Sequence, residues 1–294
     1  MTNRREIAGG QELRLRVEVS FCACADAHPP PDPNMQGEHC PPKQRAEGTM
    51  AEKESQGKEL ILVGTVHRDP DGFKKLIGVL ARERPRAVGV EASPYGLVFR
   101  CREGRRLRRR LGRRLRRWAK ARGCAWQSWG QLLAIDLQLA LPFEYRAALR
   151  YCRDTGARLS LIDLSSWSRE AIQTQWHQMV SPENLGLISA EPPEALRLVV
   201  QRDYEMAARL LEEEAQSLVA AFLGSSTEEA SWKEREAVLA GKVAELFGGM
   251  RVGRLVYVGG WQHLLGCGGC ETLYQQLEHL RPRRVLLAGS AKGG

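Results

Sequence analysis

Short apolar runs alternate with longer amphipathic stretches along the chain from Lys58 onward. The runs are rich in Val, Ile and Leu without polar alternation, which is typical of parallel strands that are buried on both faces. The expected strands are residues 60–63, 87–90, 159–162, 255–258 and 285–287. Together these runs predict a mostly parallel central sheet.

The stretches between the runs have the periodicity of helices. In the segment FKKLIGVLARERP, Phe73, Leu76, Ile77 and Leu80 recur on one helical face, and Pro85 follows the expected end. Strands that alternate with helices predict an α/β fold in which helices flank the sheet and further helices are inserted between strands. A chain of 294 residues with 43% hydrophobic residues can bury a substantial core in such a fold.

The first part of the chain has a different composition. Residues 1–56 contain PPPDP and CPPK and show no apolar periodicity, which favours disorder. We therefore expect a disordered tail over residues 1–56 and a single α/β domain over residues 57–294. Charged residues interrupt any signal-peptide core, and no stretch reaches the roughly 18 apolar residues of a membrane-spanning helix. These features predict a cytoplasmic protein without a transmembrane segment.

Side chains suited to metal binding or acid–base chemistry follow four of the expected strands. The first strand leads into GTVH, which ends at His67, and the fourth leads into GWQH, which ends at His263. Glu91 follows the second strand and Asp163 follows the third. Because the carboxyl ends of parallel strands line one crevice of an open sheet, these side chains are expected to converge. Glycine before each histidine would let the backbone turn tightly and approach a ligand closely.

The two histidines and the glutamate suggest a shared metal site. Two imidazoles, from His67 and His263, and the carboxylate of Glu91 would leave coordination positions open for water, as a catalytic metal requires. The alternative is that each histidine is a hydrogen-bonded turn residue with an unrelated structural role. The repetition of Gly-x-x-His, with Glu91 between the two copies, favours the shared site.

Five segments, in the same order along the chain, resemble the TraB/PrgY/GumN family, whose relatives include the Tiki proteases and the erythromycin esterase-like proteins. The segments are LILVGTVHRDP, PRAVGVEAS, FEYRAALRYCRDTGARLSLIDLS, EREAVLAGKVAEL and RLVYVGGWQHLLG. The resemblance covers roughly residues 58–266. It implies an α/β core and a metal-dependent hydrolase, peptidase-like as in the Tiki branch, with a divalent ion such as Mn²⁺, Co²⁺ or Zn²⁺.

The resemblance also implies roles for individual residues. The family's histidines correspond to His67 and His263, its acidic residue to Glu91, and the Glu of its helical motif to Glu144. Where the family often has Asp-Arg, this chain has Asp163 followed by Leu, so any role of that arginine is missing.

A further family motif, which pairs an arginine with an acid on a helix, fits two places in this chain. One is RDYEMAARL, beginning at Arg202, and the other is REAVLAGKV, beginning at Arg235. The segment that begins at Arg202 matches the motif more closely in sequence. Arg235 has the better spacing to the final histidine, and we favour it. For either arginine the alternative is a salt bridge on a surface helix.

A strongly basic segment lies between Arg100 and Arg122. It contains 13 Lys or Arg and one acid, a net charge of +12, whereas the whole chain has a net charge of +9. Leu107, Leu111, Leu115 and Trp118 recur at helical spacing, which predicts an inserted helix with one apolar seam. The arginines opposite the seam could face water, a nucleic acid or an anionic membrane surface.

Two functions are therefore considered. The first is a metal-dependent hydrolase, acting on a peptide or another small substrate, with a carboxylate as proton acceptor and an arginine that stabilises the oxyanion. The second is a non-catalytic peptide-binding or regulatory protein, or one that binds an anionic partner through the Arg-rich helix. The sequence lacks the HExxH helix that would identify a zinc peptidase independently.

Overall fold

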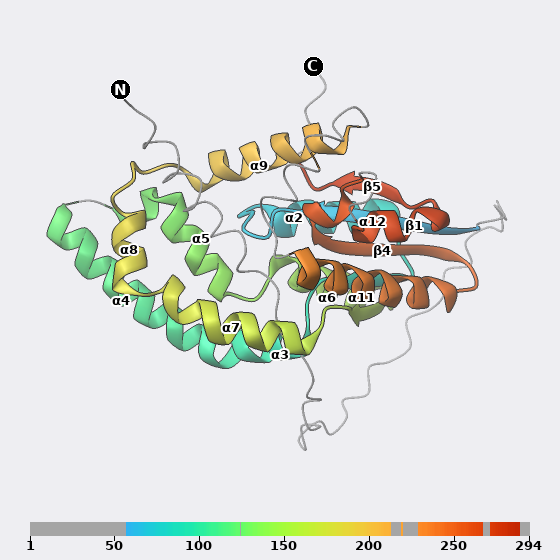
Figure 1. Cartoon of the computed structure of the whole chain (residues 1–294), viewed down its shortest axis with the longest axis horizontal. Helices are drawn as coiled ribbons and strands as arrows, with labels where there is room; N and C mark the ends of the chain where they lie inside the picture. Colours follow the sequence, from blue (N-terminus) through green and yellow to red (C-terminus); the bar gives the residue numbers. More distant parts are fainter. Residues whose placement is uncertain (1–56, 124, 213–218, 220–228, 267–270, 289–294) are drawn as a thin grey trace, which may run out of the picture.

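A parallel sheet forms the centre of the protein (Figure 1). The computed structural model describes residues 57–123, 125–212, 219, 229–266 and 271–288, and within them the sheet has five strands in the order β3-β2-β4-β1-β5. The strands are β1 (Lys58–Thr65), β2 (Ala87–Val90), β3 (Arg158–Leu161), β4 (Gly253–Gly260) and β5 (Arg283–Leu286). All neighbouring strands are parallel, and no strand end differs from its expected position by more than two residues. The tail expected over residues 1–56 lies outside the described residues.

Helices surround the sheet and fill the connections, which confirms the expected α/β fold. The longer ones are α2 (Gly72–Glu83), α4 (Arg105–Arg122), α5 (Gly130–Leu139), α6 (Phe143–Thr155), α7 (Ser165–Met179), α9 (Leu196–Leu211) and α11 (Glu229–Gly248). The shorter ones are α3 (Pro94–Phe99), α8 (Pro182–Ile188), α12 (Leu273–Gln276), the π-helical turn η1 (Arg100–Gly104), and the 3-10 turns η2 (Trp126–Ser128), η4 (Trp261–Leu264) and η5 (Glu278–Leu280).

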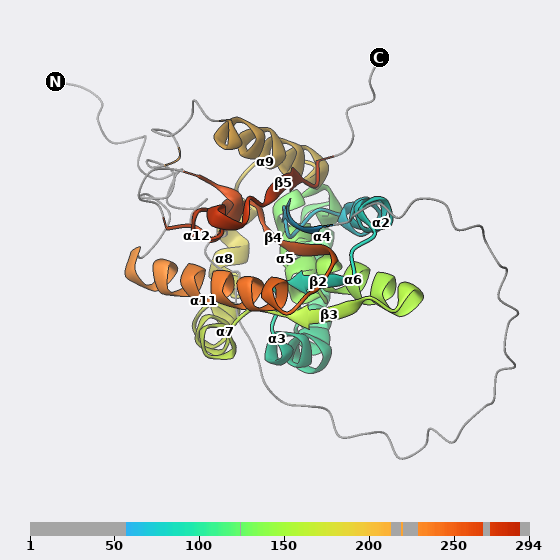
Figure 2. The same cartoon turned by 90° about the vertical axis from the view of Figure 1, so that its right-hand side faces the viewer.

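Both faces of the sheet are buried, as the unbroken apolar runs predict. On β1, Ile61 and Val63 pack into one core with α2, α6 and α9, whereas Leu60 and Leu62 pack into a second core with α11 and α12. This alternation follows from the two-residue period of a strand. Figure 2 shows α11 on one side of the sheet and α2 and α6 on the other.

A third core joins the helices that extend beyond the sheet (Figure 1). Leu111 and Leu115 of α4 are buried there, and Leu107 and Trp118 are partly buried, so the predicted apolar seam is present. The seam packs with apolar residues of α5, α7 and α8. The inserted region is therefore larger than the segment 100–122 that the charge pattern marked.

Candidate functional site

The carboxyl ends of β1, β2 and β4 meet at the residues that carry the candidate chemistry. In the parallel register, Gly64 of β1 lies opposite Gly259 of β4, and Val90 of β2 lies opposite Val258 of β4. The chain leaves β1 toward His67, two residues beyond the strand end, and enters the turn η4 after β4. Neighbouring strands thus bring two distant Gly-x-x-His motifs to one edge of the sheet.

Glu91 is the centre of the site. Its Oε1 lies 3.0 Å from Nε2 of His263, and its Oε2 lies 3.9 Å from Nε2 of His67. Oε2 also accepts a hydrogen bond of 2.6 Å from the main-chain N–H of Gly260. The three residues expected to share a metal are therefore neighbours, and both imidazoles direct Nε2 toward one carboxylate.

The other ring nitrogen of each histidine contacts a second carboxylate. Nδ1 of His67 lies 2.8 Å from Oε1 of Glu144, and Nδ1 of His263 lies 2.5 Å from Oε1 of Glu236. Glu144 Oε1 also accepts the hydroxyl hydrogen bond of Thr65 at 2.9 Å. A carboxylate on Nδ1 fixes the orientation of the ring and leaves Nε2 to act, an arrangement common around metal-ligating histidines.

Two residues of α9 hold the chain just before and just after His67. The hydroxyl of Tyr204 accepts a hydrogen bond of 3.2 Å from the N–H of Val66, and Arg68 forms a 2.6 Å ion pair with Asp203. These contacts fix the residues before and after the histidine. On the other side of the site, the Trp232 ring stacks parallel to the His263 ring, with centroids 5.2 Å apart.

Two glycines at the carboxyl end of β4 leave the space that Glu91 and His67 occupy. A Cβ at position 259 would lie 2.1 Å from the Tyr257 hydroxyl and 2.5 Å from Glu91 Oε2, and a Cβ at position 260 would lie 3.1 Å from His67 Nε2. Gly260 has a φ of −57°, which other residues adopt readily. The glycine is therefore needed for close approach rather than for an unusual turn.

The structure places one of the two candidate arginines in the site. The side chain of Arg235, on α11, is 4% exposed; its Nη2 lies 2.6 Å from Glu91 Oε1 and its Nε lies 3.2 Å from Asp163 Oδ1. Arg202 lies elsewhere, on α9, where its 55% exposed side chain pairs with Glu194. Arg202 is thus a surface ion pair, and Arg235 positions two of the candidate carboxylates.

Charge interactions dominate the protonation of the buried groups. Burial lowers the pKa of His263, but the negative charges of Glu236 and Glu91 outweigh this effect and raise the pKa to about 10. For His67, burial is likewise outweighed by the hydrogen bond and charge of Glu144, so its pKa is also raised. Burial raises the pKa of Glu91, but the positive charges of His263 and Arg235 hold it well below its usual value. Glu91 is accordingly an ionised carboxylate.

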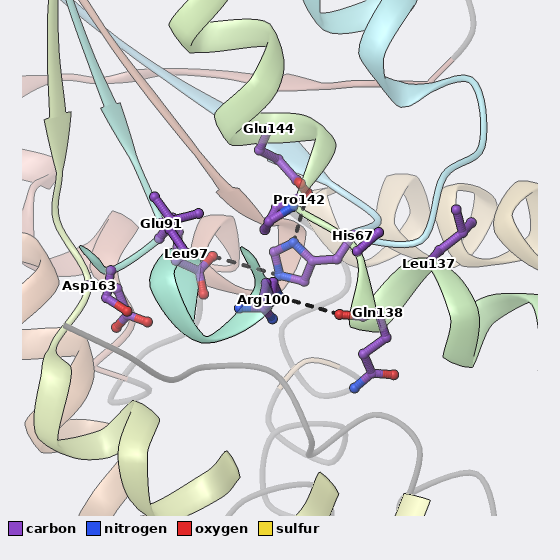
Figure 3. A pocket seen from close by; sticks show the side chains of 12 residues that line it. His67, Glu91, Leu97, Arg100, Leu137, Gln138, Pro142, Glu144 and Asp163 are labelled. Carbon is purple, nitrogen blue, oxygen red and sulfur yellow. Dashed lines mark hydrogen bonds and ion pairs between the residues drawn. The ribbon is translucent and has the colours of Figure 1, made fainter. Parts of the chain in front are cut away.

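A small cavity of about 40 Å³ opens on the His67 side of the site (Figure 3). Its lining includes Glu91, Glu144 and Asp163, but neither Arg235 nor His263. The side chain of His67 is 24% exposed, whereas that of Glu91 is 1% exposed. Solvent or a ligand therefore reaches the site beside His67.

Glu144 lines this cavity and has one carboxylate oxygen without a hydrogen-bond partner among the described residues. Its side chain is 4% exposed, and its Oε2 has no hydrogen-bond partner among the described residues. A buried carboxylate oxygen without a partner is unfavourable, because the lost hydration is not replaced. The oxygen is therefore suited to accept a proton or a hydrogen bond from a bound molecule.

The donor chemistry of the site fits a divalent cation, although its present spacing is that of a hydrogen-bonded network. Across the described residues, no group of three or more His, Cys, Asp or Glu side chains is spaced to hold a metal ion. A cation at Glu91 would have to replace the bond between Glu91 and His263. The cluster nevertheless offers carboxylate oxygens and imidazole nitrogens, which are ligand types that Mn²⁺, Co²⁺ and Zn²⁺ take. The cluster comprises Glu91, Glu144, Asp163, Glu236, Arg235, His67 and His263.

Two further residues of the site, Glu236 and Trp232, are not among the residues predicted from the sequence. Glu236 directly follows Arg235 and supplies the acid of the Arg-acid motif. Its Oε1 contacts His263, and its Oε2 accepts a hydrogen bond of 2.6 Å from the main-chain N–H of Leu273. Trp232 lies one helical turn before Glu236, on the same face of α11. Helical spacing from Arg235 could have indicated both.

Comparison of the chain with protein-family models, with curated proteins and with solved structures gives no match. None of the helices in the described part of the chain is both long and apolar enough to span a membrane.

Proposed function

We propose that the protein is a metal-dependent hydrolase of peptide-like amide bonds. The observation that carries this proposal is Glu144, which lines the cavity beside His67 and whose buried Oε2 has no partner among the described residues. The resemblance to the TraB/PrgY/GumN family agrees with this proposal. Nε2 of His67, Nε2 of His263 and the carboxylate of Glu91 would hold the divalent ion, and both imidazoles would lose their Nε2 protons when it binds.

When bound, the ion supplies a water of lowered pKa and polarises the substrate carbonyl. Glu144 then accepts the proton of the attacking water at Oε2, while its Oε1 keeps the His67 ring in place. The water oxygen joins the carbonyl carbon, the C–N bond breaks, and Glu144 returns the proton to the departing nitrogen. The Thr65 hydroxyl donates a hydrogen bond to Oε1 of the same carboxylate and so helps to hold it in place.

The role that we propose for Arg235 is not the expected one, in which an arginine stabilises the oxyanion. Its guanidinium is buried behind Glu91, bonds Glu91 and Asp163, and is not among the residues that line the cavity. We therefore assign it to keeping Glu91 ionised and to holding Glu91 and Asp163 in place.

The test combines metal analysis with a cleavage assay. Full-length protein supplied with Mn²⁺, Co²⁺ or Zn²⁺ is expected to retain one ion per chain and to cleave members of a peptide library in a chelator-sensitive manner. Glu144→Gln keeps the acceptor for His67 and removes the base, so it should retain the metal and lose roughly 100-fold or more in kcat. Glu245→Gln, on the exposed side of α11, is the matched control. A protein that retains none of these ions and cleaves no peptide would favour the non-catalytic, peptide-binding alternative.

A second candidate function concerns the exposed side of α4, which we propose binds nucleic-acid phosphates. This basic face consists of the exposed residues Arg105, Arg106, Arg109, Arg110, Arg113, Arg114, Arg116, Arg117 and Lys120. The apolar seam of the same helix is already packed against α5, α7 and α8, so it is not available to enter a lipid bilayer. A row of cations without apolar anchors is better suited to phosphate contacts.

Fluorescence anisotropy with labelled single-stranded and double-stranded DNA and RNA tests this candidate. Binding should weaken steeply as salt increases, and replacing Arg106, Arg109, Arg110 and Arg113 with Gln should abolish it. The matched control replaces four exposed arginines of α6 and α9 with Gln: Arg150, Arg197, Arg202 and Arg209. Binding to anionic vesicles but not to nucleic acids would redirect the proposal to a membrane surface, and binding to neither would end it.

A further inference from the structure

Two buried serines, Ser93 and Ser168, share a hydrogen bond beside the cavity. Their hydroxyl oxygens lie 3.1 Å apart, and either hydroxyl could be the donor. Ser93 is 3% exposed and lines the cavity shown in Figure 3, whereas Ser168, on α7, is 0% exposed and is not part of the lining. Neither hydroxyl has a second hydrogen-bond partner in the part of the chain that the structure describes.

Burial decides which of the two hydroxyls donates. Each hydroxyl carries one hydrogen and two acceptor lone pairs. A buried hydroxyl hydrogen without an acceptor is costly, because its bond to water is lost and not replaced. The hydrogen of Ser168 has only the Ser93 oxygen to receive it, so Ser168 donates and Ser93 accepts. The hydrogen of Ser93 is then left for a group inside the cavity.

The segment that carries Ser93 is held in place by main-chain hydrogen bonds. The N–H of Asp163 donates a bond of 3.3 Å to the Ala92 carbonyl, and the N–H of Leu97 donates one of 3.2 Å to the Ser93 carbonyl. Ser93 is the N-cap residue of α3, where a serine hydroxyl usually bonds an N–H of its own helix. This hydroxyl makes no such bond and contacts Ser168 instead.

The proposed reaction needs a donor of this kind at the cavity. When water adds to the amide carbon, the carbonyl oxygen becomes an oxyanion, and a fixed hydrogen-bond donor stabilises it. Arg235 does not line the cavity, whereas Ser93 lines it and follows Glu91 by two residues. The cavity measures about 40 Å³, little more than the roughly 30 Å³ that one water occupies in the liquid. A carbonyl bonded to Ser93 would therefore lie close to His67 and Glu144, which line the same small space.

We infer that Ser93 donates its hydroxyl hydrogen to the substrate carbonyl oxygen and stabilises the oxyanion. This role rests on the proposed hydrolase. As Glu144 takes the proton of the attacking water, the water oxygen joins the carbonyl carbon and the electron pair of the C=O bond moves onto the oxygen beside Ser93. The pair returns when the C–N bond breaks, and the proton on Glu144 passes to the departing nitrogen. Ser93 keeps its proton and forms no covalent bond, and Ser168 is a positioning residue that orients it.

The two serines provide a matched pair of variants, because each alanine substitution removes one hydroxyl and breaks the same hydrogen bond. In full-length protein supplied with Mn²⁺, Ser93→Ala should lower kcat about 100-fold at similar KM, since its contact strengthens in the transition state. Ser168→Ala should lower kcat by no more than about 5-fold, because Ser93 keeps its hydrogen and loses only its orienting bond. Ser93→Thr retains a hydroxyl and should recover most of kcat. Equal losses of kcat in the two alanine variants would overturn the role of Ser93.

Thermal unfolding separates this role from a structural one. Ser93→Ala strands the buried hydrogen of Ser168 and should lower Tm more than Ser168→Ala does. The double alanine variant removes both hydroxyls, so it should regain most of that loss in Tm while kcat stays about 100-fold low. If kcat recovered together with Tm, the hydroxyl pair would be structural only. The double variant also replaces Ser93→Ala in every assay if the single variant does not fold.

A phosphinic dipeptide analogue distinguishes a failure of this inference from a failure of the hydrolase. Its charged P–O oxygen imitates the oxyanion, and calorimetry should show that Ser93→Ala binds it roughly 10- to 100-fold more weakly than the wild type or Ser168→Ala. An active protein whose two alanine variants bind the analogue equally would overturn the role of Ser93 and leave the hydrolase standing. A protein that cleaves no peptide but binds the analogue through Ser93 would do the reverse. If there is neither cleavage nor binding that depends on Ser93, both proposals fall.

Discussion

Two regions of the molecule concentrate charge, and they do so in opposite ways. Around Glu91 the charged groups are buried, and Arg235, with a side chain 4% exposed, bonds two carboxylates at once. On the basic face of α4 the cations are exposed and follow one another without an acid between residues 105 and 122. Removing a partner inside the first region leaves a buried charge, whereas a change on the second alters a solvated surface. Arginine therefore holds buried carboxylates in place in one region and adds positive charge to a solvated surface in the other.

The largest effect is expected at the paired histidines, because they are proposed to serve one site. His67→Ala and His263→Ala should each abolish metal binding and activity, and the double variant should be little worse than either single one. Metal stoichiometry of the three proteins provides the measurement. If His263→Ala retained its full metal content, the two rings would not share an ion and the buried region would be a structural ion-pair network.

Arg235 and Arg202 provide the sharpest test of burial, since similar sequence motifs contain both. Arg235→Leu should destabilise the protein by about 3–5 kcal/mol because Glu91 and Asp163 would remain buried without their partner. Arg202→Leu should change the free energy of unfolding by less than about 0.5 kcal/mol. Urea unfolding at neutral pH measures both. Equal losses would mean that solvent reaches the Glu91 cluster and screens it.

The sequence was sufficient for the parts of the fold and site that depend on local pattern. Apolar runs located every strand of the described sheet, and the parallel arrangement then implied that His67, Glu91, Asp163 and His263 would lie at one edge. Spacing to the final histidine favoured Arg235 over Arg202, but the two helices have similar local patterns, and only tertiary packing determines which one faces the site.

The remaining site features depend on packing between segments that are distant in sequence. Arg100 belongs to a run of basic residues that are alike in sequence, and its place in the cavity wall, with its guanidinium over the Trp176 ring, depends on the π-helical turn η1 and on tertiary packing. The need for glycine at position 259 was likewise hidden, since it comes from the side chain of Tyr257 on the same strand and from the carboxylate of Glu91 just after β2, rather than from the backbone conformation of Gly259 itself.

An intermediate effect is expected at the glycines that border the buried region. Gly259→Ala should destabilise the protein by about 1–3 kcal/mol and reduce metal binding, because the new methyl group would overlap the Tyr257 hydroxyl and Glu91 Oε2. Gly78→Ala is the control, since it lies in α2 with no atom within 4 Å of the added Cβ. That change should stabilise the helix by about 0.5–1 kcal/mol. Thermal and urea unfolding distinguish the two signs, and a neutral Gly259→Ala would show that Glu91 can move aside at little cost.

The smallest effect on stability is expected for substitutions on the basic face. Replacing Arg106, Arg109, Arg110 and Arg113 with Gln should change the free energy of unfolding by less than about 1 kcal/mol, because these side chains are exposed and Gln is also a good helix former. Leu111→Ala on the same helix removes a seam residue that is 1% exposed and should cost about 2–5 kcal/mol. Urea unfolding of both variants compares the two sides of a single helix. A large loss in the arginine variant would mean that these side chains hold α4 in place, and the exposed charges could then no longer be attributed to a partner.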